Sequence, residues 1–248
     1  MDLIETQYQT NLRHPWETSR FTFFAHLLGG YKDPVSVLDA GAGDGWFAGS
    51  LLPLLPEGST ITCYDMHYTP AHLSELYKKT TPGISFTAEP PSEFFDVLLL
   101  LDVAEHVEDD QTFLNNLVEK NLVPDGRAVF SIPAWPWLFS DHDRFLQHFR
   151  RYTPTQATAL VRTSGLEIRQ SGGLFHLPFI ARSLLVGLGK IGSGSSQPTP
   201  EISWQHGTLV TGLVSGVLYA DTVFSRLMSS IGINLPGLSW WASCRKPT

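Results

Sequence analysis

Short apolar runs alternate along the chain with segments in which apolar residues recur at helical spacing. A nearly continuous apolar run is typical of a strand buried on both faces of a parallel sheet, and the clearest one spans residues 95–101. Helical spacing predicts helices over 15–28, 46–55, 70–79 and 108–121 and another from Thr153 onward, and the expected strands occupy 34–39, 60–64, 84–87, 95–101, 127–132, 165–169 and 239–245. This alternation predicts an α/β fold with a doubly wound, mostly parallel seven-stranded sheet.

An apolar, mainly helical insertion is expected between the last two strands. We therefore divide the chain into a core at 1–172 with an N-terminal helix, the insertion at 173–237, and a final strand at 238–248 that returns to the sheet. The insertion holds an apolar segment, a Gly/Ser-rich linker at 192–196, and a helical stretch whose apolar residues share one face: Leu209, Leu213, Val214, Val217 and Leu218. Its uncharged part, 207–220, is shorter than the roughly 18 residues that span a bilayer, so no spanning helix is expected.

The charges are distributed unevenly. The chain has 248 residues and a net charge of −7, and residues 171–248 carry +3 against −10 for the rest. An acidic chain without a basic stripe disfavours a nucleic-acid partner. The apolar C-terminal third is either an extra helical layer on the core or a surface that meets a lipid, an apolar substrate or a second subunit.

Targeting signals and disulfides are not expected. The first residues lack the basic and apolar regions of a signal peptide, which predicts a cytoplasmic protein with membrane-peripheral contact left open. Cys63 and Cys244 are too few for a disulfide scaffold and are expected to be buried, reduced thiols.

A glycine loop, Gly41-x-Gly43-x-Gly45, follows the first expected strand. Glycine permits positive φ and lets the backbone approach a ligand closely. The spacing differs from the dinucleotide fingerprint and from a phosphate-binding loop. Asp39 precedes the glycines, and Asp65 ends the next strand, where a carboxylate can accept hydrogen bonds from a ribose. These features suit a ligand that has a ribose and a positive charge but no pyrophosphate.

Residues 37–45 resemble motif I of the class I S-adenosylmethionine-dependent methyltransferases, 95–107 resemble the motif around their fourth strand, and 122–126 resemble their turn before the fifth. The resemblance covers about residues 34–172. It implies a Rossmann-like fold, S-adenosyl-L-methionine as cofactor and S-adenosyl-L-homocysteine as product. The implied cofactor-binding residues are Asp39, Gly41, Gly43, Gly45, Asp65, Met66, Glu89, Leu101 and Asp102, with Asp65 on the ribose and Met66 and Glu89 near the adenine.

A segment after the fourth strand, Asp102-x-x-Glu105-His106, contains three candidate ligands of a divalent metal. A similar E-x-x-E-H motif carries a metal in the ubiquinone-pathway O-methyltransferases and the small-RNA 2′-O-methyltransferases. Asp102 replaces the first glutamate of that motif and shortens its reach. A structural role or a base role for His106 is therefore favoured over a metal site.

The segment 131–143 is aromatic and then polar, as expected of a small-molecule pocket after the fifth strand. A hydroxyl acceptor must lose a proton, and histidine is the usual base. We expect His142 to be the leading base, with His106, His148 and Tyr152 as further catalytic candidates. A packed loop with a solvated basic edge is the alternative. The N-terminal helix, with Arg13 and Arg20, is either a lid over the cofactor or an ordinary amphipathic helix.

The sequence thus predicts a methyltransferase that acts on a small-molecule or lipid-like acceptor, with oxygen as the expected acceptor atom. The alternative is a catalytically silent S-adenosylmethionine-binding or interaction protein, which would bind the cofactor without forming S-adenosylhomocysteine. A homodimer contact or a peripheral membrane contact through the insertion is left open.

Overall fold

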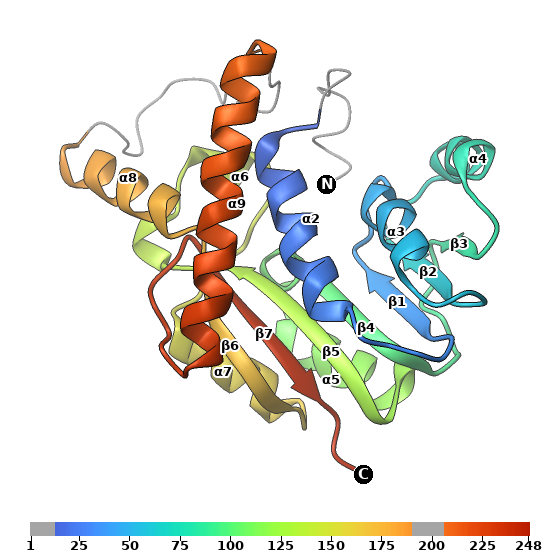
Figure 1. The fold of residues 1–248 in the computed structure, drawn as a ribbon. Helices are drawn as coiled ribbons and strands as arrows, with labels where there is room; N and C mark the ends of the chain where they lie inside the picture. The colour runs from blue at the N-terminus through green and yellow to red at the C-terminus, as the bar shows by residue number, and fades with distance from the viewer. Residues whose placement is uncertain (1–12, 190–205) are drawn as a thin grey trace.

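A seven-stranded sheet lies between two layers of helices in the computed structural model, which describes residues 13–189 and 206–248 (Figure 1). The strand order is β3-β2-β1-β4-β5-β7-β6, and β7 runs antiparallel to both of its neighbours while the other pairs are parallel. The strands are β1 Ser36–Ala40, β2 Thr60–Tyr64, β3 Ile84–Thr87, β4 Phe95–Leu101, β5 Leu122–Pro133, β6 Glu167–Leu174 and β7 Ser239–Arg245. The predicted doubly wound, mostly parallel sheet is confirmed.

Helices cover both faces of the sheet. Helices α5 and α7 pack on one face, and α2, α3 and α9 pack on the other (Figure 1). The helices are α2 Pro15–Leu28, α3 Trp46–Leu51, α4 Pro70–Lys79, α5 Asp110–Asn121, α6 Asp141–Phe145, α7 Pro154–Thr163, α8 His176–Gly187 and α9 Thr208–Ser230. Three short 3₁₀ turns are η1 Leu52–Leu54, η2 Ala104–His106 and η3 Pro136–Leu138.

Strand β4 explains why a continuous apolar run was needed at the centre of the sheet. Its side chains alternate between the two cores: Leu98 and Leu100 join the cluster under α5 and α7, whereas Val97 and Leu99 join the cluster under α2 and α9. Both faces of β4 are therefore buried, as expected for a central parallel strand. The two cysteines are buried and unpaired, in agreement with the sequence prediction.

Three boundaries differ from the prediction by four residues or more. Strand β5 begins at Leu122, which pairs with Phe95 before a register shift; the segment expected as a turn thus forms a bulge inside the strand. The helix expected over 46–55 ends at Leu51, because Pro53 cannot continue the α-helical hydrogen bonds and a 3₁₀ turn follows. Strand β6 continues to Leu174 instead of ending near residue 169.

The helix expected in the insertion is longer than predicted. Helix α9 has 23 residues and continues through Asp221 and Arg226, so it is long and apolar enough to cross a membrane by length and composition alone. Of its most apolar 18-residue window, 22% is buried. The apolar face predicted for it is mostly not buried: Leu218 is buried, but Leu209 and Leu213 are exposed. The Gly/Ser linker at 192–196 lies outside the described residues.

Candidate active site

The glycine loop connects β1 to α3 at the carboxyl edge of the sheet. Gly41, Gly43 and Gly45 all have positive φ, at 74°, 55° and 69°. A Cβ atom on Gly41 would lie 2.6 Å from a methyl of Val103, and one on Gly45 would lie 2.7 Å from the ring of Phe86. The backbone of this loop is thus pressed against its neighbours, and only glycine fits these two positions.

Asp65 holds the glycine loop from the tip of β2. Its Oδ2 accepts a hydrogen bond from the Gly43 amide at 3.1 Å, and its Oδ1 accepts one from the His67 amide at 2.9 Å. The Tyr68 hydroxyl donates to the Gly43 carbonyl at 2.7 Å. Each carboxylate oxygen can accept more than one hydrogen bond, so Asp65 keeps acceptor capacity for a ribose hydroxyl while it fixes the loop.

Asp39 supplies a buried acidic group beneath the same loop. It is 4% exposed, and its Oδ2 has no hydrogen-bond partner among the described residues. Burial raises the pKa of Asp39 to about 7. A buried carboxylate oxygen without a donor is costly, and a cationic ligand would offset that cost. The donor set therefore fits S-adenosylmethionine, which carries a sulfonium and an ammonium group.

The two residues expected near the adenine lie at the tips of neighbouring strands. Met66 follows β2 directly, and its side chain is 68% exposed. Glu89 follows β3 and is exposed, and its backbone amide donates to the Thr87 hydroxyl at 3.0 Å. The adenine-side roles of Met66 and Glu89 stay predictions.

The first turns of α2 contact the loops after β1 and β4. Arg20 pairs with Asp102 at 2.5 Å and donates to the Leu101 carbonyl at 2.9 Å. Arg13, just before the helix, pairs with Asp44 in the glycine loop. The N-terminal segment thus touches the edge where the cofactor is expected, which is the placement that a lid requires.

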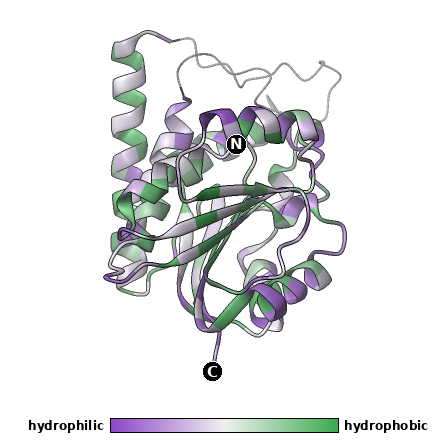
Figure 2. Ribbon diagram, turned by 90° about the vertical axis from the view of Figure 1, so that its right-hand side faces the viewer, coloured by the Kyte–Doolittle hydropathy of each residue, from purple (hydrophilic) through white to green (hydrophobic). Residues whose placement is uncertain are grey.

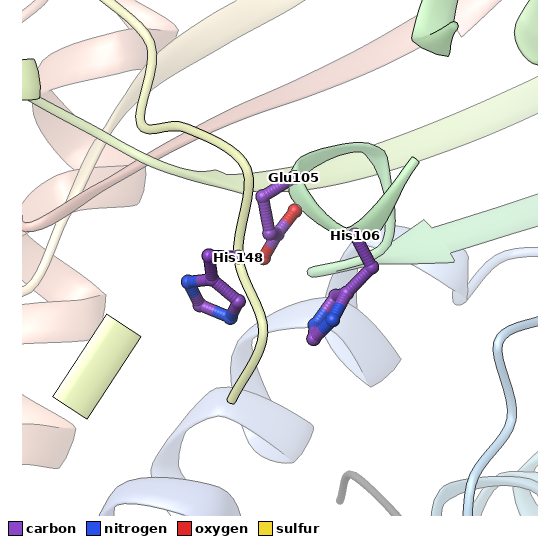
Figure 3. A group of neighbouring side chains, drawn as sticks. All are labelled: Glu105, His106 and His148. Atoms are coloured by element: carbon purple, nitrogen blue, oxygen red, sulfur yellow. The ribbon is translucent and has the colours of Figure 1, made fainter. Parts of the chain in front are cut away.

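Glu105, His106 and His148 form the group of side chains that could hold a metal. One ligand atom from each lies within 4.8 Å of the others (Figure 3). Glu105 and His106 come from η2, while His148 approaches from the segment after α6. The sequence instead grouped Asp102 with Glu105 and His106.

Asp102 is not a member of this group, so that part of the prediction is wrong. It precedes η2 with a φ of 59°, outside the helical register that would align it with Glu105 and His106. Its side chain pairs with Arg20 and accepts a hydrogen bond from the Ser131 hydroxyl at 2.7 Å. Arg20 on α2 and Ser131 on β5 therefore hold Asp102 outside the cluster.

Glu105 is the most unusual group of the cluster electrostatically. It is fully buried, and neither carboxylate oxygen has a hydrogen-bond partner among the described residues. Burial raises the pKa of Glu105 well above its usual value, and the charge of Asp102 adds to the shift. Such a carboxyl group either holds a proton or requires a cation beside it.

Asp143 orients His148. Its Oδ1 lies 3.1 Å from His148 Nδ1 and accepts a hydrogen bond from Arg151 at 2.7 Å. Burial alone would raise the pKa of Asp143, but the hydrogen bond to His148 and the charge of Arg151 outweigh it and hold the pKa well below its usual range. An imidazole fixed by a carboxylate at one nitrogen is the arrangement found at both general bases and metal ligands. The sequence shows Asp143 and Arg151 only as charges in an otherwise aromatic region.

The two remaining catalytic candidates are not members of this group. His142 is half-buried on α6 and is not one of the three clustered side chains. Tyr152 is buried, and its hydroxyl donates to Asp110 at 2.6 Å and lies 3.1 Å from the Ala104 carbonyl. Tyr152 thus holds η2 in place, which is a positioning role for Glu105 and His106.

The aromatic loop after β5 packs against the insertion. Trp135 donates to the Gly237 carbonyl at 2.8 Å, and its ring lies 5.6 Å from that of Phe179 on α8. Trp137 lies 6.1 Å from the same ring and is 51% exposed. Trp135 is therefore packed, as the alternative of a packed loop predicted, whereas Trp137 remains on the surface.

Two cavities are lined neither by the acidic strand tips nor by the Glu105–His106–His148 group. The larger, about 570 Å³, is at the opposite edge of the sheet and is lined by Tyr31, Asp96 and Arg127, among others. The smaller, about 420 Å³, lies beside Trp135 and Trp240. Ligands of open parallel sheets bind at the carboxyl edge, where neighbouring strands lead to opposite faces. Strands β1 and β4 meet this condition, so we assign the site by its chemistry rather than by cavity size.

Comparison with known proteins agrees with this placement. A family model described as a methyltransferase domain matches residues 8–171. The ubiquinone biosynthesis O-methyltransferase of Rickettsia conorii is 27% identical over 169 residues, covering 58% of this chain and 55% of the relative. That of Rickettsia canadensis is 26% identical over 168 residues, covering 57% of this chain and 66% of the relative. The chain thus spans less than two thirds of either relative.

Solved structures share the fold at low identity. The N-methyltransferase NodS from Bradyrhizobium japonicum is 19% identical with a TM-score of 0.53, covering 94% of this chain and 98% of that chain. The cyclase SpnF is 14% identical with a TM-score of 0.54, covering 93% and 81%. Such similarity shows the fold alone. Because the family model matches more than half of the sequence, this chain belongs to the methyltransferase domain family, within the class I S-adenosylmethionine-dependent methyltransferase superfamily.

Proposed function

We propose that this protein transfers a methyl group from S-adenosylmethionine to an oxygen of a small-molecule or lipid-like acceptor. The observation that carries this proposal is that two groups share one edge of the sheet: the acidic tips of β1 and β2, and the Glu105–His106–His148 cluster after β4. The first suits a cationic nucleoside, and the second suits removal of a hydroxyl proton. The names of the Rickettsia relatives support oxygen as the acceptor atom.

On the cofactor side, residues of this chain would bind and orient S-adenosylmethionine. S-adenosylmethionine supplies an activated methyl group when bound. Asp65 would accept hydrogen bonds from the ribose, and ionised Asp39 would favour the positive charge of the ligand. The glycine loop brings backbone close to the ligand because no side chain intervenes. Much of the rate enhancement of methyl transfer can come from such orientation.

On the acceptor side, the chain moves a proton. His148 would take the hydroxyl proton at the nitrogen opposite the one that faces Asp143, and the Asp143 carboxylate would stabilise the resulting imidazolium. His106, whose ring lies 4.5 Å from that of His148, would line the same position. His142 stays the alternative base that the sequence favoured.

A metal-assisted version of the same reaction is the second candidate. One carboxylate and two imidazoles form a donor set that suits a divalent transition metal. The unpartnered oxygens of buried Glu105 are the specific observation in its favour. A metal held by Glu105, His106 and His148 would lower the pKa of a bound acceptor hydroxyl.

Product formation tests the proposed function. The purified protein is incubated with S-adenosylmethionine and a panel of catechols and polyprenylated phenols, with and without Mg²⁺, Mn²⁺ or Zn²⁺, and S-adenosylhomocysteine is measured. We expect product with at least one phenolic acceptor. Tight cofactor binding by calorimetry without product from any acceptor would instead support the catalytically silent alternative. Activity that survives EDTA would contradict the metal-assisted version alone.

A further inference from the structure

Helix α9 has its polar and apolar faces reversed relative to a helix of a soluble core. Four of its five buried residues are polar: Asp221, Thr222, Ser225 and Ser229. Three of them bond to neighbouring elements: Asp221 accepts from the His176 amide at 2.8 Å, Ser225 donates to the Gly173 carbonyl at 2.5 Å, and Ser229 accepts from Gln170 at 2.9 Å. A surface helix usually buries its apolar stripe and exposes its polar one. The reversal indicates that something apolar covers the outer face.

The outer face consists of aliphatic stripes on two helices. We use the name apolar outer face for Ile180 and Leu184 on α8, Leu188 just after it, and Leu209, Leu213 and Val217 on α9. Each set recurs every four residues and thus lies along one side of its helix. Leu209 is 89% exposed and Leu213 70%, which is unusual for clustered leucines. Figure 2 shows the free half of α9 largely in green and pale colours, clear of the sheet.

Asp221 on α9 and Arg182 on α8 form hydrogen bonds with neighbouring elements of the protein. Asp221 is buried and accepts hydrogen bonds from the backbone amides of His176 and Leu177 at the start of α8, at 2.8 and 3.3 Å. Arg182 donates to the Ser140 hydroxyl at 2.6 Å. Residues 207–220 carry no charge at all. A protein partner would require a polar rim with hydrogen bonds around its apolar centre, whereas a bilayer interior requires none.

Near the point where each helix meets the body of the protein lies an exposed aromatic residue that also carries a polar group. Tyr219 is 51% exposed and lies next to buried Leu218, where α9 joins the body of the protein. Trp137 is 51% exposed and its ring contacts Phe179 on α8. Tyrosine and tryptophan prefer the boundary between lipid tails and water. Their position agrees with insertion of the parts of α8 and α9 that lie beyond them.

From these observations we propose that the apolar outer face inserts into one leaflet of a lipid bilayer. The part of α9 before Asp221 starts at Thr208 and is about 20 Å long at 1.5 Å per residue, which is less than the roughly 30 Å of a bilayer core. Helix α9 also packs against α2 and β6, and within the part before Asp221 the side chains of Val214 and Leu218 contact the core (Figure 1). The helix therefore enters the membrane surface without crossing it, in spite of its total length.

This contact would bring the proposed acceptor side to the membrane, and in that respect it builds on the proposed function. Helix α8 packs on the loop after β5 through Phe179, Trp135 and Trp137. The same loop leads into α6, which carries Asp143 beside His148. A lipid-like acceptor held in the bilayer would thus reach the cluster along α8.

Vesicle flotation with the full chain tests the proposal. The vesicles contain phosphatidylcholine with phosphatidylglycerol, and the variant is the double substitution Leu209→Glu and Leu213→Glu. Both side chains are exposed, so folding should be unaffected. We expect the wild-type protein to float with the vesicles and the variant to bind them at least about tenfold more weakly, because two charges enter the apolar contact. Binding should persist in about 1 M NaCl, where the Debye length is only about 3 Å.

The matched control is Leu54→Glu, because Leu54 is 62% exposed on η1, outside the apolar outer face, and this variant should float like the wild type. Failure of the wild-type protein to float would overturn the proposal. If light scattering then shows a dimer that the double substitution dissociates, a second copy covers the face instead. Cofactor affinity, measured on the same samples, should be unchanged by the double substitution, so failure of this proposal is distinguishable from failure of the proposed function.

Discussion

The glycine loop after β1 and the cluster after β4 lie at the same edge of the sheet, but their polar groups are held differently. In the loop, the amide and carbonyl of Gly43 are both bonded, to Asp65 and Tyr68. In the cluster, buried Glu105 has no hydrogen-bond partner among the described residues. The loop is a preformed binding surface, whereas the cluster keeps an electrostatic cost that a proton, a cation or a substrate can relieve. Substitutions of Asp65 and of Glu105 should therefore have opposite consequences for stability.

The largest expected effect is on the cofactor side. Asp65→Ala removes the acceptor for the Gly43 amide and for the proposed ribose contact. We expect the affinity for S-adenosylmethionine, measured by calorimetry, to fall about 100-fold, or about 3 kcal/mol, since hydrogen bonds to a charged group contribute roughly 1.5–3 kcal/mol each. Glu75→Ala on exposed α4 is the matched control and should change nothing. Unchanged affinity in the Asp65 variant would remove the cofactor assignment.

Glu105→Gln should separate catalysis from stability. Turnover should fall roughly 30-fold or more with cofactor affinity unchanged, because the group acts on the acceptor side. As the pH rises above 4.5, the usual pKa of a glutamate, the variant should also unfold at an increasingly higher temperature than the wild type, because it no longer carries a buried carboxyl group whose ionised form is disfavoured.

The control for this substitution is Glu108→Gln, three residues further along and exposed. Thermal unfolding is followed at pH 6 and pH 8 with and without added Zn²⁺ or Mn²⁺. A metal-holding cluster should raise the unfolding temperature of the wild type and not of the Glu105 variant. If the Glu105 variant unfolded at a lower temperature than the wild type at pH 8, the interpretation that buried Glu105 destabilises the folded protein would be contradicted.

His148 and His142 can be compared directly as candidate bases. His148→Gln should lower kcat about tenfold or more, whereas His142→Gln should stay within about twofold, because only His148 lies in the cluster and is oriented by Asp143. The reverse order of effects would make His142 the base, as the sequence analysis expected.

The smallest expected effect concerns pH and Asp39. Because burial raises its pKa to about 7, cofactor affinity should rise a few-fold from pH 6 to pH 8 as the carboxylate ionises. Without cofactor, the stability of the folded protein should change in the opposite direction. Asp39 keeps its proton up to about pH 7 in the folded state but loses it near pH 3.8 in the unfolded state, so the free energy of unfolding falls as the pH rises between these values. Both trends should vanish in Asp39→Asn, and a flat affinity profile in the wild type would argue against an ionised Asp39 beside the ligand.

The sequence determined the local elements of the cofactor side. The glycine loop and the position of Asp65 at the tip of β2 are local features, since each depends on a few consecutive residues at the end of a strand. The buried run at 95–101 likewise fixed the central strand, because its neighbours on both faces had to be apolar.

The acceptor side and the insertion were decided by tertiary structure. Helical spacing grouped Asp102 with Glu105, but Arg20 and Ser131 draw Asp102 away. His148 lies beside Glu105 because the Phe149 amide donates to the Glu105 carbonyl at 2.8 Å and Asp143 holds the His148 ring. In α9, periodicity showed an apolar face but not which way it points; hydrogen bonds from polar residues to the sheet turned that face outward. Spacing along a chain specifies which side chains share a face, whereas contacts between distant segments decide what that face meets.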